Sequence, residues 1–486
     1  MKEYAAKQPS PWVSVLPLAV LTLLLYVVIR CFGGDAINGG SQIALLSATS
    51  VCVMLAIGIY RCKWAVLEEA IIDNIRASAS AIIILLLIGA IAGSWMVSGV
   101  VPTMIYFGLK ILHPSFFLVA SCAICAGVSL MTGSSWTTIA TIGVALMGIG
   151  QAMGFPEGWI AGAIISGAYF GDKISLLSDT TVLASSTVGV PIFTHIRYML
   201  YTTVPSFVIA LAVFVIAGLT LDHTGGTHAG MYAESLRGTF RITPWLLAVP
   251  VATGVLIVRK LPAIVTLFCA AVFACIAMLL AQPELVAKVA GVGGLDFMSG
   301  FKGVLMSCFG PTAIPTGSPQ LDELVATRGM AGMLNTVWLI ICAMCFGGVM
   351  TGSGMLGSLT SVFLRFVRRA FSAVASTVGA GIFFNLCTAD QYISIILSGR
   401  LFRELYAERG LEPRLLSRSV EDSATVCSVL VPWNSCGMTQ ATVLGVSTFV
   451  YMPYCIFNIV SPLMSLMVAA IGWKIKRAAG TAAHPH

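Results

Sequence analysis

Acidic and hydroxyl side chains interrupt several strongly apolar stretches of this sequence, and they are the residues best suited to chemistry. Asp179 is followed by Thr180 and Thr181, and Asp172 is followed by Lys173. A buried ionised carboxylate is unstable unless it is paired or neutralised, so it tends to hold a proton, and a cation can take the proton's place. Because Na⁺ is a hard ion that prefers carboxylate, hydroxyl and carbonyl oxygens, we expect a site at which Na⁺ and H⁺ compete for one acid.

A second set of polar residues, later in the chain, could complete this site. Asn434 and Ser435 offer neutral oxygen ligands, and we predict that Asp179 and Asn434 together hold Na⁺. Asp390 and Asn385 lie near the tip of an apolar hairpin. There Asp390 would restore the charge that Asn434 lacks.

Several of these residues also have an ordinary structural interpretation. Asp179, Asp172 and Asp390 could cap helix ends, and Asp172 could instead lie at the mouth of a cavity. Lys173 could contact an anionic substrate, mimic a second cation or extend toward the membrane interface. The sequence leaves these alternatives open.

Other charged residues have alternatives of the same kind. Glu421 and Asp422 follow an arginine-rich joint, and they could pair with Arg418 or Arg414 or belong to a cation path. His113 and His195 lie beside predicted membrane interfaces, so we interpret both as solvated joints.

The composition places all these residues in a membrane. The chain has 486 residues, of which 58% are hydrophobic and only 10% are charged. Soluble domains carry about 25% charged residues, so too little polar surface exists to cover a water-facing globule. The sequence contains neither a His-Glu nor a Gly-Lys dipeptide, so zinc-protease and phosphate-loop motifs are missing. We therefore expect no enzyme activity, no cofactor and no nucleic-acid partner.

Apolar runs long enough to cross a bilayer recur along the whole sequence, which predicts an all-α polytopic membrane protein. Ordinary spans are expected at residues 12–32, 42–60, 78–100, 197–219, 244–258, 261–281, 333–355 and 447–472. Residues 157–190 and 412–440 are also long enough, but charged and hydroxyl residues interrupt them, so broken helices are expected there.

Two further segments, residues 115–153 and 371–407, consist of apolar arms that meet at a polar tip. We predict hairpins, either re-entrant or fully spanning, with Ser134 and Ser135 at the first tip and Asp390 at the second. Backbone that leaves the helix at membrane depth is tolerated only where it lines a cavity or packs in protein. The tips and the breaks should therefore face one site.

The two halves of the sequence repeat one another at a constant offset of 255 residues. The matched pairs are Ser98-Gly99 with Ser353-Gly354, the tip at Gly133 to Ser135 with Thr388 to Asp390, and Asp179-Thr180 with Asn434-Ser435. Paired broken helices in two inverted repeats are typical of secondary transporters, whose substrate site lies near the membrane midplane. Alternating access at that site is the function this pattern predicts.

The distribution of basic residues supports opposite orientations for the two halves. The joint at residues 61–77 has three Lys or Arg and its partner at 316–332 has one, whereas the joint at 101–114 has one and its partner at 356–369 has three. Because Lys and Arg concentrate on the cytoplasmic side, both termini are expected in the cytoplasm, whether the hairpins span fully or not. The terminal basic residues are Lys2, Lys7, Lys474, Lys476 and Arg477.

Longer motifs at these places resemble the NhaC-type Na⁺/H⁺ antiporter family of the ion-transporter superfamily. They are Gly133 to Thr138, Gly162 to Ala184 (GAIISGAYFGDKISLLSDTTVLA), Thr194 to Pro205, Ser417 to Gly437 (SRSVEDSATVCSVLVPWNSCG) and Tyr451 to Leu463. The resemblance implies Na⁺ exchanged for H⁺, inverted repeats with hairpins and a sliding transport domain.

The chain departs from that family's pattern at three positions. Leu176 and Val429 stand where such sequences usually have Pro, so each interruption could partly re-wind. Val182 stands in place of Asn, which removes one oxygen ligand. Some members similar to this family exchange malate and lactate with coupled Na⁺ and H⁺. Organic-acid exchange is therefore the alternative function, with Lys173 as its anion contact.

The expected organisation follows from these features. We predict N-terminal helices at residues 1–64, a first repeat at 65–220, linking helices and external loops at 221–315, a second repeat at 316–472 and a cytoplasmic tail at 473–486. The expected location is the plasma (inner) membrane. Lipid, Na⁺ and H⁺ are the expected partners, and a homodimer is one option for the assembly.

Overall fold

The computed structural model describes residues 9–32, 39–221, 227–259, 261–294, 296–317, 322, 325–365, 367 and 369–475. Within these residues the chain is helical, apart from one isolated β-bridge between Thr312 and Thr327. The prediction for the termini rests partly on Lys2, Lys7, Lys476 and Arg477, which lie outside the described residues. The same holds for most of the predicted tail.

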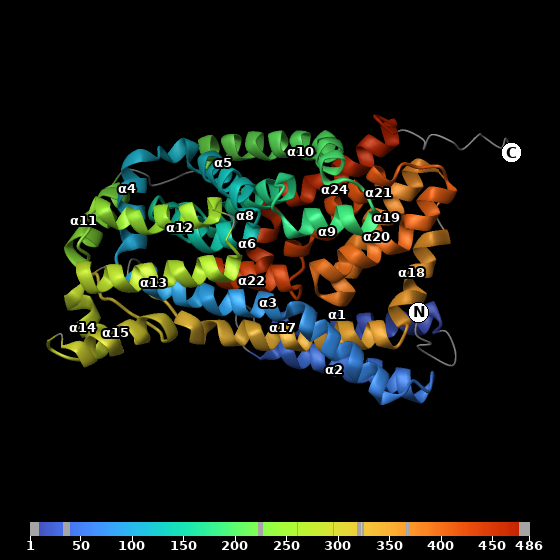
Figure 1. The fold of residues 1–486 in the computed structure, drawn as a ribbon, viewed down its shortest axis with the longest axis horizontal. Helices are drawn as coiled ribbons and strands as arrows, with labels where there is room; N and C mark the ends of the chain where they lie inside the picture. The colour runs from blue at the N-terminus through green and yellow to red at the C-terminus, as the bar shows by residue number, and fades with distance from the viewer. Residues whose placement is uncertain are drawn as a thin grey trace.

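Long apolar helices form one side of the molecule. They are α1 (Pro11–Phe32), α2 (Gly40–Gly58), α3 (Trp64–Val97) and α17 (Gly329–Gly352). α3 and α17 lie side by side along the length of the molecule, with α2 against α17 and α1 against α2 (Figure 1). Gly348 permits this close packing, because a Cβ there would lie 2.7 Å from the Cα of Ile71.

The rest of the first half contains a hairpin and a bent helix. Its elements are α4 (Val100–Ile111), α5 (Pro114–Thr132), α6 (Ser135–Thr138), a π-helical turn (Ile139–Gly143), α7 (Val144–Ala152), α8 (Glu157–Ile174), α9 (Asp179–Val188) and α10 (Ile192–Thr220). α8 packs on α5 through glycines: a Cβ at Gly167 or Gly171 would lie 2.0 or 2.2 Å from a carbonyl oxygen of α5. This packing fixes the end of α8 that carries Asp172.

Linking helices connect the halves. They are α11 (Thr227–Thr239), a 3₁₀ turn (Pro244–Leu247), α12 (Ala248–Val258), α13 (Ala263–Ala281), α14 (Pro283–Ala290) and α15 (Phe297–Phe309). α13 packs against α3, and α14 with α15 lies at the end of the molecule away from α18 (Figure 1).

The second half repeats the order of the first. Its remaining elements are α18 (Met355–Arg365), α19 (Ala370–Thr388), α20 (Gln391–Glu408), α21 (Pro413–Val420), a π-helical turn (Glu421–Thr425), a 3₁₀ turn (Ser428–Leu430), α22 (Ser435–Leu444), α23 (Thr448–Tyr451), a 3₁₀ turn (Met452–Tyr454) and α24 (Ile456–Ile471). α19 and α20 form the second hairpin.

The helices confirm an all-helical protein with many membrane spans. In the described part of the chain, 8 helices are long and apolar enough to cross a membrane, or up to 11 if each bent pair is one span. The break predicted within residues 157–190 is a bend of 46° between α8 and α9. The segment 412–440 is likewise interrupted, by π and 3₁₀ turns and by the non-helical residues 431–434.

Three predicted spans differ from the structure. The span expected at 78–100 belongs to α3, which begins at Trp64 and is 34 residues long. Residues 244–258 form one arm of a pair bent by 95°, and the span expected at 447–472 is bent by 55° at Cys455. In each hairpin the first arm, α5 or α19, is itself long and apolar enough to span a membrane.

Corresponding elements of the two halves begin at nearly constant separations. α4 and α18 begin 255 residues apart, at Val100 and Met355. From the hairpins onward the helix caps are 256 residues apart: Ser134 and Asp390 each cap the second hairpin arm, while Ser178 and Asn434 each cap the helix after the break. The caps therefore align Asn434 with Ser178, whereas the sequence repeat aligned Asn434 with Asp179.

Candidate functional site

The first hairpin tip packs directly on the break between α8 and α9. Gly133 ends α5 with φ +66°, a left-handed conformation in which a side chain is strained. A Cβ at this position would lie 2.5 Å from the carbonyl carbon of Leu177, inside the break. Only glycine therefore allows the tip and the break to approach so closely.

Hydroxyl groups hold the break open. The Ser175 hydroxyl donates to the Leu130 carbonyl of α5 at 2.8 Å, and the Ser178 side chain caps α9 by accepting from the Thr181 amide at 3.3 Å. Ser178, and not Asp179, is thus the capping residue, which leaves the Asp179 carboxylate free of that role. Leu176 remains in the non-helical segment despite the missing proline, so this interruption does not re-wind.

The Asp172 carboxylate receives two hydrogen bonds from the hairpin tip. The Ser135 hydroxyl donates to Oδ2 at 2.7 Å and the Ser135 amide donates to the same oxygen at 3.1 Å. Ser135 is the first residue of α6, so the carboxylate also faces a helix N-terminus, which stabilises negative charge. The structure thereby joins the buried Asp172 to the tip predicted from the sequence.

The second tip is built around Asp390. Its Oδ1 accepts from the Ile393 amide at 3.0 Å and caps α20, while its Oδ2 accepts from the Ser435 hydroxyl at 3.2 Å. The Ser435 amide donates to the Ala389 carbonyl at 2.8 Å, so this tip is docked on the N-terminus of α22. Asp390 therefore has both the capping role and a contact with the predicted partner Ser435.

The two tips and the first break border one cavity of about 620 Å³. Among the described residues, three acids line it, namely Asp172, Asp179 and Asp390, and no Lys or Arg does. The polar residues with them include Ser78 and Ser80 of α3, Ser134, Thr137, Thr180, Gln391 and Tyr392. Asp179 is exposed, whereas Asp172 and Asp390 are buried, so the cavity presents one accessible and two enclosed carboxylates.

Other predicted site residues lie behind the cavity wall. The Asn434 amide donates to the Asn385 Oδ1 at 3.1 Å, and the Asn385 amide in turn donates to the Ala424 carbonyl at 2.7 Å. The Thr181 hydroxyl donates to the Lys173 carbonyl at 3.0 Å. These contacts brace the two breaks. Asn434 is not among the residues that line the cavity with Asp179 in the described part of the chain.

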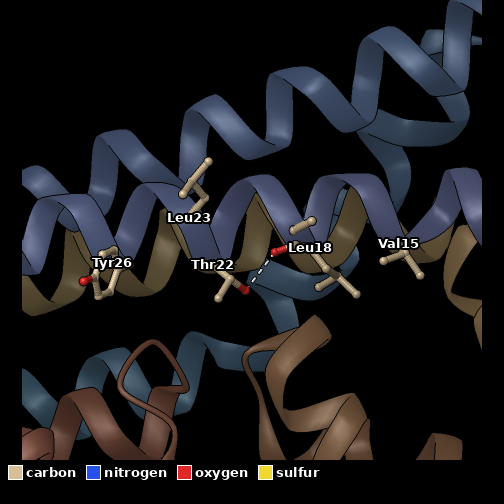
Figure 2. A pocket seen from close by; sticks show the side chains of 6 residues that line it. Val15, Leu18, Thr22, Leu23 and Tyr26 are labelled. Carbon is tan, nitrogen blue, oxygen red and sulfur yellow. Dashed lines mark hydrogen bonds between the residues drawn. The ribbon is translucent and has the colours of Figure 1, made fainter.

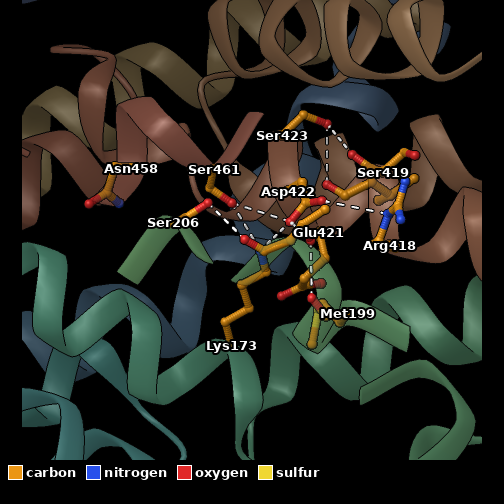
Figure 3. Close-up of polar contacts among 12 residues, drawn as sticks. Lys173, Met199, Ser206, Arg418, Ser419, Glu421, Asp422, Ser423, Asn458 and Ser461 are labelled. Atoms are coloured by element: carbon orange, nitrogen blue, oxygen red, sulfur yellow. Dashed lines mark hydrogen bonds and ion pairs between the residues drawn. The ribbon is translucent and has the colours of Figure 1, made fainter. Parts of the chain in front are cut away.

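Lys173 does not lie at the cavity wall. Its ammonium group pairs with Asp422 and donates to the Ser461 hydroxyl at 3.0 Å, and Lys173 and Asp422 are fully buried (Figure 3). Asp422 Oδ1 also accepts from the hydroxyls of Thr202 and Ser461, each at 3.2 Å, and Arg418 Nε lies 3.9 Å from Asp422 Oδ2. The charge that an anionic substrate would need is therefore already neutralised.

Glu421 and His195 complete this buried polar region. Glu421 Oε1 accepts from the Thr180 hydroxyl at 3.2 Å, although a pairing with Arg418 was one of the options from the sequence. The interpretation of His195 as a solvated joint is wrong: the residue is fully buried, and its Nδ1 lies 2.8 Å from the Ser417 hydroxyl. His113 is exposed, as expected.

The Lys173–Asp422 pair is the part of this region that the sequence did not predict. The two residues are 249 positions apart, and the packing of α24 against both α8 and the π turn brings them together. The sequence does contain one indication of this pair, because Lys173 lies in the first predicted broken helix and Asp422 lies in the second. Val429, where a proline was expected, lies in a 3₁₀ turn, so the second interruption is partly wound.

A second hollow, of about 590 Å³, lies along α1, and none of its described lining residues is acidic. It is lined by Val15, Leu18, Ala19, Thr22, Leu23 and Tyr26 (Figure 2). The Thr22 hydroxyl donates to the Leu18 carbonyl of its own helix at 2.9 Å. This apolar surface suits contact with lipid and offers no group to bind an ion.

The chain is similar in sequence to known antiporters. A family model described as "Na+/H+ antiporter family" matches residues 167–473. A protein of Alkalihalophilus pseudofirmus named "Na(+)/H(+) antiporter NhaC" is 35% identical over 425 residues, which cover 87% of this chain and 89% of that protein.

Two other relatives have different names. A "Malate-2H(+)/Na(+)-lactate antiporter" of Bacillus subtilis is 34% identical over 437 residues, covering 89% of each chain. An "Arginine/ornithine antiporter ArcD" of Halobacterium salinarum is 34% identical over 474 residues, covering 96% of this chain and 93% of that protein. On the family match and on these identities, which extend along most of its length, the chain belongs to the Na⁺/H⁺ antiporter family.

Proposed function

We propose that this membrane antiporter exchanges Na⁺ for H⁺ by alternating access at the cavity between the two hairpin tips and the α8–α9 break. The family consists of secondary transporters and not of enzymes, so the chain is a multi-pass antiporter. One observation carries the proposal: three carboxylates line the cavity, and none of its described lining residues is Lys or Arg. Such a site attracts cations and disfavours anions.

The exchange would use the two carboxylates of the bent helix. Asp179 is open to the cavity and would meet the incoming cation, while Asp172, whose carboxylate is oriented by hydrogen bonds from the Ser135 hydroxyl and amide, would hold it. Hydroxyls of Ser134, Thr137 and Thr180 supply further oxygen ligands along the same wall. When Na⁺ leaves, a proton takes its place on the carboxylate, because an unpaired charge at this depth is unstable.

We further propose that the two halves are inverted repeats that each contribute a hairpin and a broken helix. The recurrence of the four caps at a separation of 256 residues supports this, as does the exchange of basic residues between matched joints. In this arrangement Asn434 of the second half corresponds to Ser178 of the first half. A direct Na⁺ contact from Asn434 would require its amide to leave Asn385 during the transport cycle.

The same reasoning supports a cytoplasmic position for both termini in a cell membrane. The Ser10 amide donates to the Tyr60 hydroxyl at 3.0 Å, and the Ser358 hydroxyl donates to the Pro9 carbonyl at 2.6 Å. The start of α1 therefore lies with the joint that follows α2, which carries Arg61 and Lys63, and with the first turn of α18. Reporter fusions after residue 486 would test the cytoplasmic position of the C-terminus. A fluorescent protein should fold there, and an active alkaline phosphatase would contradict that position.

A cationic amino acid is a second candidate cargo. A cavity of about 620 Å³ is far larger than one Na⁺ needs, and its acids would suit a guanidinium or ammonium group, the type of cargo named for the Halobacterium relative. Malate or lactate exchange, named for the Bacillus relative, was the alternative from the sequence. It has less support, because Lys173 pairs with Asp422 and cannot meet a carboxylate in the cavity.

The test is a transport assay with purified protein in proteoliposomes. A gradient of Na⁺, arginine, malate or lactate is imposed in turn, and the proton flux that each gradient drives is measured. We expect Na⁺ to drive proton flux in the wild-type protein, and Asp179→Asn and Asp172→Asn to abolish it. Asp73→Asn changes an exposed acid of α3 and is the matched control, with wild-type flux expected. Wild-type flux in Asp179→Asn and Asp172→Asn would contradict the proposed site.

A further inference from the structure

Glu421 is a buried acid outside the cavity, and its surroundings differ from those of its neighbour Asp422. Its Oε1 accepts one hydrogen bond, from the neutral Thr180 hydroxyl, and its Oε2 has no hydrogen-bond partner in the described structure. No Lys or Arg nitrogen of the described residues lies within ion-pair distance of it. Asp422, in contrast, has Lys173 and two hydroxyls.

These surroundings suit a neutral acid better than a carboxylate. A fully buried charge is stable only with a paired cation or several hydrogen bonds, and Glu421 has neither. Two buried cations, Lys173 and Arg418, belong to the same polar region, and both face Asp422 (Figure 3). Glu421 can therefore hold a proton without any rearrangement of the Lys173–Asp422 pair.

Thr180 connects Glu421 to the cavity. Its side chain lines the cavity wall, and its hydroxyl is 3.2 Å from Glu421 Oε1. When Glu421 is ionised, the Thr180 hydroxyl donates to it. When Glu421 is protonated, the same contact reverses, and Glu421 can pass its proton to the Thr180 oxygen while Thr180 releases its own proton to water in the cavity. One hydroxyl therefore separates the acid from the transport site.

The local backbone also fits a functional role. Glu421 begins a π-helical turn, Glu421–Thr425, between α21 and the second break. Such turns interrupt helices frequently at functional sites. Here the turn places Glu421 toward Thr180 and places Asp422, the next residue, against Lys173.

The elements around this turn differ in the charged residues that they carry. α19 and α24, which pack against it, contain no charged residue. The charged residues and histidines of the other surrounding elements are Glu157, Asp172 and Lys173 of α8, Asp179 of α9, His195 and Arg197 of α10, Asp390, Arg400, Arg403, Glu404 and Glu408 of α20 and its cap, and Arg414, Arg418 and Asp422 beside Glu421 itself. The tyrosines of these elements are Tyr169, Tyr198, Tyr201, Tyr392 and Tyr406.

We propose that Glu421 is a second proton-carrying site, so that each Na⁺ is exchanged for two protons. This rests on the proposed Na⁺/H⁺ exchange. One proton leaves the cavity carboxylate that Na⁺ occupies, and the second leaves Glu421 through Thr180. The cycle then moves two positive charges one way and one the other way, and it responds to the membrane potential. Without Glu421 only the first proton remains, and the exchange becomes electroneutral.

The test measures the exchange ratio in proteoliposomes whose membrane potential is clamped at zero with valinomycin and K⁺. A tenfold Na⁺ gradient should be balanced by a pH difference of about half a unit in the wild-type protein and of about one unit in Glu421→Gln. With the clamp removed, an imposed potential should change the wild-type rate and leave the Glu421→Gln rate unchanged. Glu404→Gln, an exposed acid of α20, is the matched control and should behave as wild type.

Each outcome decides the matter. An electroneutral wild-type exchange, or a Glu421→Gln protein that keeps the wild-type balance point, would overturn the proposal. If Glu421→Gln does not fold, Glu421→Asp should keep the ratio of two, and the wild-type balance point alone still tests the second proton. A wild-type protein without any Na⁺/H⁺ exchange would overturn the proposed function, and the role of Glu421 with it.

Discussion

The buried pair between Lys173 and Asp422 makes a quantitative prediction about stability. Removing one partner of a buried ion pair costs about 3–5 kcal/mol, because the other charge is left uncompensated. The two single substitutions are not equivalent in this structure. In Lys173→Met, Asp422 keeps two hydroxyl donors and still faces Arg418 at 3.9 Å. In Asp422→Asn, both Lys173 and Arg418 lose their carboxylate, and Lys173 keeps the Ser461 hydroxyl at 3.0 Å and the face of the Phe457 ring, whose centroid lies 5.7 Å from Nζ.

We therefore expect Lys173→Met to lower the free energy of unfolding by about 3 kcal/mol and Asp422→Asn by about 5 kcal/mol. The double variant should lose less than the sum of these, by about 2–3 kcal/mol, because the two residues interact directly. The assay is unfolding of the purified protein by SDS titration in mixed micelles, followed by tryptophan fluorescence.

Arg76→Met is the matched control for removing a paired cation. Arg76 and Asp73 form an exposed pair at 2.8 Å, with 74% and 60% of their side chains accessible. Its loss should change the free energy of unfolding by less than about 0.5 kcal/mol. The reasoning would be refuted if Lys173→Met cost more than Asp422→Asn, or if the double variant were additive to within about 0.5 kcal/mol.

Two further predictions concern the hairpin tip and the cavity. Gly133→Ala and Gly291→Ala impose the same backbone strain, with φ +66° and +75°, but only the first brings a Cβ against Leu177. Gly133→Ala should therefore be less stable than Gly291→Ala by about 1–3 kcal/mol, the usual cost of overpacking, and should transport more slowly. Equal stability of the two variants would contradict the close contact. A cysteine at Ser80, on the cavity wall, should react with a water-soluble thiol reagent, and one at the buried Ser121 should not. Peptide mass spectrometry reads both, and the reverse pattern would contradict the cavity.

The sequence predicted the elements around the site because their signals are local. Hydroxyl and acidic residues within apolar runs mark the break at residues 175–178, and the hydrogen bonds of Ser175 and Ser178 explain why it forms even with Leu176 in place of proline. The polar tips at Ser134 and Asp390 are recognisable in the same way, because each begins a helix arm with a capping side chain.

What the sequence could not predict depends on contacts between distant residues. His195 was expected to be solvated because it stands just after a joint, yet α10 begins at Ile192 and Ser417 provides a buried partner. The pairing of Lys173 with Asp422, and of Asp172 with Ser135, follows from how α8 packs and not from spacing along the chain. The shift from 255 to 256 residues between the halves became visible only from the caps.

The most direct test of the cavity as the cation site is equilibrium binding of radioactive Na⁺ to the purified protein across a range of pH. Wild type and Asp73→Asn should bind Na⁺ with equal affinity, and that affinity should fall as the pH falls, since protons compete for the same carboxylates. Asp179→Asn and Asp172→Asn should each weaken binding by at least about tenfold. Unchanged affinity in both variants, with the wild-type dependence on pH, would contradict the account.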